Sequence, residues 1–392
     1  MRACRPICRP GAGRMTRSAR RVAGVVAAVC TLAALPPLGA GKPATTKPIA
    51  PERQRELSRL LATFFRSSRP EEWLQAGQRI LEIGSTGPKR LLPALTTKLR
   101  SFRRDYQNAF AQQAVRVRLD KLSEAAKDHG GSRERLASEL RKARRTALAL
   151  LKASDLTAER ITREADPVME RLNDLLAVDR QTLLDRSEPL RRQRKELLAL
   201  TALRRRCGDI VASGAAGTKE GDPTGAPPAP AEGAYDPDKA LARFEELAAL
   251  LAMPMERGAR DTLLANAKLE SRLKPEEVEG IRDLNRIRLL LGLAPLRIDL
   301  KLCQAARDHC TDMRTGGFFS HTSPVPGKRT PWDRARKAGT TVSAENIAGA
   351  SRSGAAANRM WFHSPGHVRN MLGRFSRVGL GYDQKWTMML GK

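Results

Sequence analysis

Residues 364–370 of this 392-residue chain read SPGHVRN, and residues 345–348 read ENIA. Ser364 is a typical helix N-cap and Pro365 suits a first helical turn, so SPGHVRN predicts a short helix with His367 near its start. Four of the five histidines fall in the last quarter of the chain. Imidazole titrates near neutral pH and is the commonest metal ligand. Because histidine is scarce in this chain, its clustering in one region indicates a functional site there.

The C-terminal part of the sequence predicts helices followed by late strands. Apolar residues recur at three- and four-residue steps between positions 278 and 291, which indicates an amphipathic helix. Asp299 can cap a second helix, which Gly316 ends. Residues 377–390 predict a terminal β-hairpin with a short turn. This mixture predicts an α+β fold.

Further motifs accompany ENIA and SPGHVRN in a definite order. They are Leu284–Arg288, Gly292–Leu296, Ala305–His309, Phe318–Pro324, Trp332–Ala335, Val378–Gly381 and Trp386–Thr387. The series resembles the CAP superfamily (cysteine-rich secretory proteins, antigen 5 and plant pathogenesis-related proteins), and within it the bacterial SCP-like branch. The resemblance covers residues 276–392. It implies an α-β-α sandwich of the CAP type with an antiparallel sheet, preceded here by a mostly α-helical N-terminal region.

The resemblance also implies a ligand cavity. Its lining would include His321, Glu345 and His367, with Ser364 at the position where many eukaryotic relatives have a second glutamate. Structural roles are expected for four further residues, namely Asn346, Trp332, Trp361 and Asn370. The three tryptophans Trp332, Trp361 and Trp386 are expected to be core anchors because each buries a large apolar area.

Two imidazoles and a carboxylate form a set that suits zinc or another divalent cation, with one coordination position left open. His321, Glu345 and His367 are therefore the candidate metal ligands. The alternative is a hydrogen-bonded polar cluster that orders the loops, because buried polar groups need partners whether or not they do chemistry. We expect His309 to be structural and His363 to be exposed.

A ligand-binding domain is the function that these residues favour. No G-x-S-x-G elbow and no H-E-x-x-H helix occurs in the chain, so the sequence argues against the common serine hydrolase and zinc protease arrangements. A metal-dependent hydrolase that uses the same cavity is one alternative, and a basic helical scaffold of the cell envelope is another. The identity of the ligand stays open among lipid, peptide and glycan.

The N-terminal residues 1–40 predict a secretory signal peptide. They combine arginines, an apolar run from 22 to 35 and small residues near position 40, and Met15 is a second candidate start. We therefore expect a secreted or periplasmic (cell-envelope) protein. The formal net charge of +29 then points to anionic envelope polymers as partners. Nucleic acid is disfavoured because few aromatic residues interleave with the basic runs.

The remaining chain predicts three segments before the C-terminal domain at 276–392. Residues 51–210 have helical periodicity throughout and predict a helical bundle or a coiled-coil-like region. Residues 211–235 are rich in Gly, Pro and Ala and predict a flexible linker, and residues 236–275 a helical connector. Cys303 and Cys310 are expected to be free and buried, since positions seven apart on one helix lie about 10 Å apart, beyond disulfide reach.

Overall fold

The computed structural model describes residues 49–84, 86–213, 236–349 and 351–392. The predicted signal peptide and most of the predicted linker lie outside these residues. The described residues divide into two compact units, one formed by those between 49 and 112, between 189 and 213 and at 236–237, and the other by those between 113 and 188 and between 238 and 392. None of the described helices is both long and apolar enough to cross a membrane.

The first unit is helical, as the periodicity predicts. Its helices are α2 (Pro51–Arg66), α3 (Pro70–Leu81), the first part of α4 (Thr86–Lys127) and α9 (Glu188–Ser213). Prolines begin α2 and α3, where a missing backbone N–H costs nothing. Trp73 and Phe64 pack edge to face in the core, with the Lys98 ammonium 4.9 Å from the Trp73 ring centre.

The second unit contains the rest of α4 and a helical arm, which we define as residues 133–185. The arm comprises α5 (Arg133–Leu151), α6 (Ala158–Arg160), the π-helix η2 (Ile161–Ala165), α7 (Asp166–Leu176) and α8 (Arg180–Asp185). It packs against the C-terminal domain: α7 contacts α12 and α5 contacts α16. The arm therefore groups with the C-terminal domain, whereas the sequence suggested a single helical region over 51–210.

The predicted connector also packs on the C-terminal domain. It forms α10 (Pro237–Leu251), α11 (Ala259–Leu269) and the short 3-10 helix η3 (Glu270–Arg272). The buried Asn266 donates to Leu296 O at 2.8 Å and accepts from Ile298 N at 2.8 Å. Arg282 binds the Glu270 carboxylate through two nitrogens. Such contacts make residues 236–275 part of the fold of this unit.

The C-terminal domain alternates helices with four short strands. The elements are α12 (Pro275–Leu290), β1 (Arg297–Ile298), α13 (Leu300–Thr315), α14 (Pro331–Lys337), β2 (Ala344–Ala348), α15 (Gly354–Phe362), α16 (Pro365–Met371), β3 (Arg377–Tyr382) and β4 (Trp386–Gly391). The strand order is β1-β3-β4-β2. Strands β3, β4 and β2 pair antiparallel, whereas β1 pairs parallel to β3. The predicted antiparallel sheet is thus extended at one edge by a parallel strand, since the long connection through α13 to α16 permits a parallel crossover.

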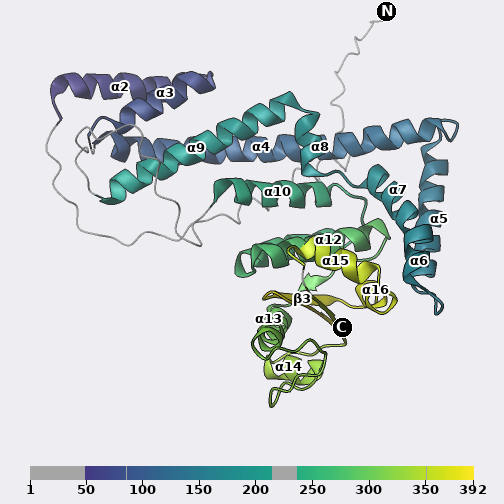
Figure 1. Ribbon diagram of the computed structural model, residues 1–392. Helices are drawn as coiled ribbons and strands as arrows, with labels where there is room; N and C mark the ends of the chain where they lie inside the picture. The colour runs from purple at the N-terminus through teal and green to yellow at the C-terminus, as the bar shows by residue number, and fades with distance from the viewer. Residues whose placement is uncertain (1–48, 85, 214–235, 350) are drawn as a thin grey trace, which may run out of the picture. The chain divides into compact units, whose positions relative to one another are not determined.

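The sheet lies between two helical layers, with α13 and α14 on one side and α12, α15 and α16 on the other (Figure 1). Glycines in β3 allow α13 to approach closely: a Cβ at Gly379 would lie 2.2 Å from Leu302 C, and one at Gly381 would lie 2.3 Å from Arg307 N. Leu380, between them, faces the opposite layer and touches Gly280 of α12. The alternation of β3 thus separates the two layers, as the sandwich architecture requires.

The predicted side-chain cap at Asp299 and the free state of Cys303 and Cys310 are confirmed. Asp299 accepts from Lys301 N and Leu302 N at the start of α13. The three described cysteines Cys207, Cys303 and Cys310 are free and buried. Burial raises the pKa of Cys303 and Cys310 to about 12.

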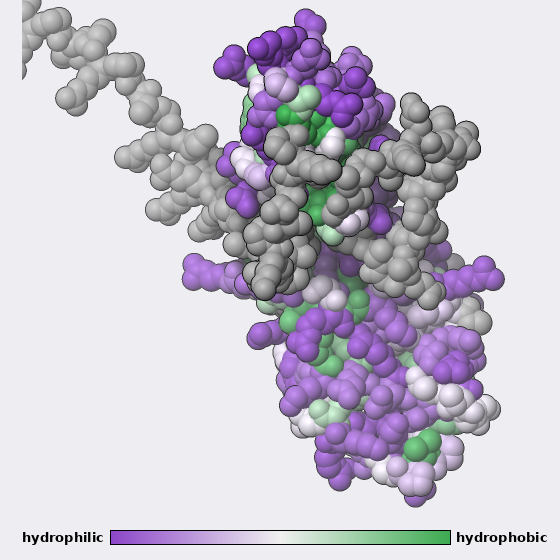
Figure 2. Space-filling view, turned by 90° about the vertical axis from the view of Figure 1, so that its left-hand side faces the viewer, coloured by the Kyte–Doolittle hydropathy of each residue, from purple (hydrophilic) through white to green (hydrophobic). Residues whose placement is uncertain are grey.

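Two of the three tryptophans in this domain are core anchors, as expected. Trp361 is 1% exposed and Trp386 is fully buried, but Trp332 is 58% exposed, so its assignment to the core was wrong. Most of the described surface in Figure 2 is hydrophilic, with small hydrophobic areas separated from one another. Among the described residues, the exposed large hydrophobic side chains are those of Phe65, Leu119, Phe319, Trp332 and Met360.

Candidate functional site

The site is assembled from four elements of the C-terminal domain. His321 lies in the loop after α13, Arg334 on α14, Glu345 on β2 and His367 on α16. The sequence predicted three of these residues, and Arg334 was missed. It stands among other basic residues in the short stretch DRARK, so neither charge nor periodicity distinguishes it from a surface arginine.

Glu345 is the buried centre of this group. Its side chain is 2% exposed, and Arg334, which is 1% exposed, donates from Nη2 to both carboxylate oxygens at 2.8 and 2.7 Å. His321 Nδ1 lies 2.8 Å from Glu345 Oε1, while half of the His321 side chain remains exposed. A buried carboxylate needs such pairing, because an isolated buried charge costs several kcal/mol.

Arg334 also fixes the loop that carries His321. Its Nη2 donates to His321 O at 3.1 Å and its Nη1 donates to Lys328 O at 3.0 Å. One guanidinium therefore joins β2, α14 and the 321–329 loop, a task that suits the rigid fork of donors in arginine. The geometry makes Arg334 a positioning residue for both His321 and Glu345.

His367 is held from both its ring and its backbone. Ser364 Oγ lies 2.8 Å from His367 Nδ1, and Asn346 Nδ2 donates to His367 O at 3.0 Å. The Ser364 side chain makes no cap bond to the helix. Burial, and then the charge of His321, lower the pKa of His367, so its imidazole is neutral at neutral pH. Because the charge on His321 affects the pKa of His367, the two imidazoles lie close enough to interact electrostatically.

The predicted structural residues join β2 to α15 and α16. Asn370 Nδ2 donates to Asn346 Oδ1 at 2.8 Å, and the Trp361 indole N–H donates to Ile347 O at 3.0 Å. Asn346 is fully buried. These contacts set the position of His367 relative to the strand that bears Glu345.

The two remaining histidines of the domain differ from each other. His309 is fully buried, with Nε2 3.1 Å from Ser320 O, and burial lowers its pKa to about 4. It is structural, as expected. His363 is not fully exposed, contrary to expectation: its Nε2 lies 2.9 Å from Asp166 Oδ2 of the helical arm. No local pattern in the sequence indicates a partner so distant along the chain.

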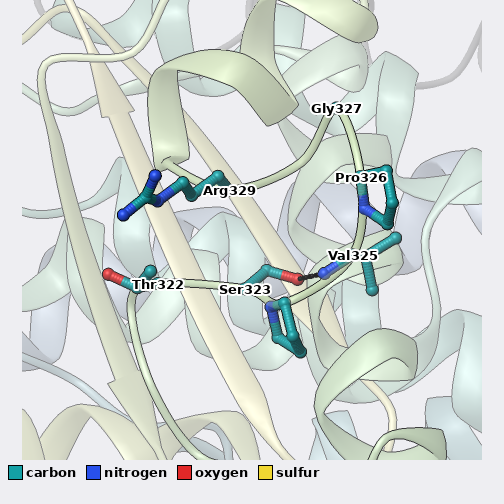
Figure 3. Close-up of a pocket in the computed structure, with 7 residues that line it drawn as sticks. Thr322, Ser323, Val325, Pro326, Gly327 and Arg329 are labelled. Carbon is teal, nitrogen blue, oxygen red and sulfur yellow. Dashed lines mark hydrogen bonds between the residues drawn. The ribbon is translucent and has the colours of Figure 1, made fainter.

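A surface hollow of about 480 Å³ adjoins the site residue His321 in the chain. Residues 322–327 and Arg329 line it (Figure 3). His321, Glu345 and His367 are not among its lining residues, so this hollow is distinct from the cavity that the sequence predicted. We name it the 322–329 hollow.

The proposed metal ligands do not form a tight cluster. Within the described part of the chain, no three His, Cys, Asp or Glu side chains are grouped so that they could hold a metal ion. Both oxygens of Glu345 are engaged by Arg334. As arranged here, Glu345 fits an ion pair with arginine better than a zinc site, and the three-ligand set stays a prediction.

The family comparison identifies the C-terminal domain. The model of the cysteine-rich secretory protein family (CAP) matches residues 281–387. Uncharacterized protein YkwD of Bacillus subtilis (strain 168) is 34% identical over 108 residues, which are 26% of this chain and 41% of that protein. Uncharacterized membrane protein YlbC of the same organism is 32% identical over 103 residues, 26% of this chain and 30% of that protein. The chain thus spans less than half the length of these relatives.

A solved structure is also similar to part of the chain. It is an extracellular protein containing a SCP domain from Bacillus anthracis str. Ames, 30% identical, with a TM-score of 0.29, and the match covers 32% of this chain and 43% of that one. The family model, at residues 281–387, includes all four residues of the site: His321, Arg334, Glu345 and His367. On this family match, residues 281–387 of the chain are a CAP domain of the cysteine-rich secretory protein family.

Proposed function

We propose that this protein is exported and that its CAP domain binds a ligand without hydrolysing it. The observation that carries the proposal is the engagement of Glu345, whose two oxygens are both held by the buried Arg334. A general base must be free to reach the proton that it abstracts. Glu345 is instead a fixed structural charge that orients His321, and the half-exposed His321 is left to contact a ligand.

The two imidazoles give the proposed site its chemistry. His321 has one ring nitrogen on Glu345, and His367 has Nδ1 on Ser364, so each ring keeps its Nε2 for another partner. Neutral imidazole both donates and accepts hydrogen bonds, which suits a polar group of a lipid, peptide or glycan. Export is supported by the basic, apolar and small-residue pattern of residues 1–40.

Native mass spectrometry of the full-length chain, purified from the envelope fraction of an expression host, tests this function. We expect an additional bound mass that is lost in His321→Ala and His367→Ala and kept in His363→Ala, a histidine of the same domain outside the site. A bound mass that all three variants retain would refute a site at these imidazoles. Recovery of the chain only in the cytosol, with residues 15–40 still attached, would refute export.

A divalent cation on His321, Glu345 and His367 is the second candidate. The observation in its favour is the proximity of two imidazoles, of which His367 has a lowered pKa and so keeps its lone pair at neutral pH. Arg334 would have to release Glu345. We expect zinc to raise the melting temperature only slightly, and the effect to vanish in His367→Ala and at mildly acidic pH. If zinc does not change the melting temperature of the parent chain and His367→Ala lowers it, the three residues form a hydrogen-bonded polar cluster and not a metal site.

Hydrolysis has one observation in its favour, the 2.8 Å contact between Ser364 Oγ and His367 Nδ1. A serine nucleophile also needs an acid that orients the histidine. Among the described residues, no carboxylate forms a hydrogen bond with His367. We therefore expect no turnover of peptide or ester substrates. Turnover that disappears in Ser364→Ala would overturn the binding proposal. If no ligand is found, the remaining alternative is a basic helical scaffold of the cell envelope.

A further inference from the structure

The loop that forms the 322–329 hollow is rigid. Ser323 N donates to Arg329 O at 2.8 Å, and Lys328 N donates to Val325 O at 3.1 Å. Ser323 Oγ accepts from Val325 N at 3.1 Å (Figure 3). Ser323 is 2% exposed. Arg334 Nη1 also donates to Lys328 O. The hollow is therefore preformed, and binding of a ligand would require little further ordering of the loop.

Arg329 is the one cation between 328 and 336 that the described residues leave without an ionic partner. Lys328 pairs with Asp312 at 3.1 Å, Arg336 pairs with Asp333 at 2.7 Å, and Arg334 is buried on Glu345. The Arg329 side chain is exposed and lines the hollow, on the side where Thr322 lies in Figure 3. A guanidinium presents paired donors that match a carboxylate in two parallel hydrogen bonds.

An exposed indole lies close to this guanidinium in the chain. Trp332 follows Arg329 by three residues, so their Cα atoms are at most about 11 Å apart. Its side chain is 58% exposed, although a tryptophan normally buries most of its area. The capping box between Thr330 and Asp333 fixes the backbone at the start of α14, where Trp332 lies. An exposed indole offers a flat apolar face for a ring to stack on.

We propose that the 322–329 hollow binds an acidic polysaccharide. The carboxylate of an acidic sugar pairs with Arg329, its hydroxyls bond to the exposed Thr322, and a neighbouring sugar ring stacks on Trp332. The neutralised Lys328 and Arg336 argue against an anionic membrane, since lipid surfaces are bound by clusters of several unpaired cations. This site is separate from His321 and His367 and does not rest on the function proposed for them.

The test measures binding of the full-length chain to polygalacturonate, a polymer of carboxylate-bearing sugars, at ~0.15 M salt, where the Debye length is about 8 Å. We expect Arg329→Gln to weaken binding at least about tenfold, because a charged hydrogen-bond pair is lost. We expect Trp332→Ala to weaken it as well. Both side chains are exposed, so neither variant should change the melting temperature. Arg336→Gln removes the same charge nearby and should change affinity little, and His367→Ala should not change it.

Each other outcome would count against the proposal. Equal losses in Arg329→Gln and Arg336→Gln would reduce the binding to diffuse attraction by a chain of net charge +29. Equal binding to neutral dextran would remove the role of the carboxylate. Arg329-dependent binding of poly-glutamate, or of phosphatidylglycerol vesicles, that exceeds the binding of polygalacturonate would reassign the hollow to an acidic peptide or to a membrane.

Discussion

His363 Nε2 lies 2.9 Å from Asp166 Oδ2, although 197 residues separate the two along the chain. Asp166 begins α7, directly after the π-helix η2, and His363 follows α15 of the CAP domain. His363 Nδ1 lies 2.9 Å from Arg359 O. Burial disfavours the charged imidazole, but the hydrogen bonds to Asp166 and to Arg359 O outweigh it and raise the pKa of His363.

Replacement of Asp166 by asparagine should lower the pKa of His363. The variant loses the carboxylate that raises this pKa, while burial, which lowers it, is unchanged. An NMR titration of the imidazole resonances measures this, and the His309 resonance is the internal control. In the parent chain the pair stabilises the fold fully below the unfolded pKa of about 6.5, and this stabilisation is lost as the pH rises through the raised pKa. An unchanged His363 titration in Asp166→Asn would show that the pair does not form in solution.

His309 should have the opposite effect on stability. Its pKa is lowered from 6.5 to about 4, so the unfolded chain binds more protons between these values and the free energy of unfolding falls as the pH drops from 6.5 to 4. The full effect is on the order of 3 kcal/mol, at 1.36 kcal/mol for each unit of pKa. Urea unfolding at several pH values measures the slope. His309→Gln should flatten it, and an equal slope in parent and variant would contradict the assignment.

Loss of Arg334 should destabilise the CAP domain strongly. Arg334→Met leaves the buried Glu345 carboxylate with only the His321 imidazole as a side-chain partner, and breaking a buried ion pair from one side typically costs about 3–5 kcal/mol. Arg336→Met, an exposed change on the same helix, should stay within about 0.5 kcal/mol of the parent. Chemical denaturation of both variants checks the contrast. Equal stabilities would mean that the Arg334–Glu345 pair is not buried in solution.

A methyl group at Gly381 should not fit between β3 and α13. The Cβ of Gly381→Ala would lie 2.3 Å from Arg307 N, and backbone atoms cannot move aside as a flexible side chain can. Overpacking of this kind costs about 1–3 kcal/mol. Gly366→Ala, with no atom within 4 Å of its Cβ, is the matched control and should be neutral or slightly stabilising. Thermal melts should therefore show a lower melting temperature for Gly381→Ala than for Gly366→Ala.

Local signals in the sequence predicted the frame of the fold well. The Asp299 cap, the helix from Pro275 and the terminal hairpin depend on residues close together in the chain, and all are present. The parallel pairing of β1 with β3 joins residues about 80 apart, and no local pattern encodes it. The contact of His363 with Asp166 was missed for the same reason.

Only part of the site was predicted, because a rare residue type such as histidine stands out in the sequence and a common one such as arginine does not. His321 and Glu345 were identified and lie in contact, whereas Arg334 was hidden among basic neighbours. The expected burial of Trp332 failed because α14 has only seven residues, and its buried face is taken by Arg334 and Ala335. On so short a helix, hydrophobicity alone does not show which side faces the core.

The burial of Cys303 and Cys310 has a consequence for the proposed export. Disulfide exchange requires a thiolate, and burial raises the pKa of both thiols to about 12, so the folded domain keeps them protonated and out of reach of an oxidant. An unfolded chain presents ordinary thiols. If the chain is exported as proposed, it must fold faster than these thiols are oxidised, since a chain with oxidised cysteines could not bury them again in the core.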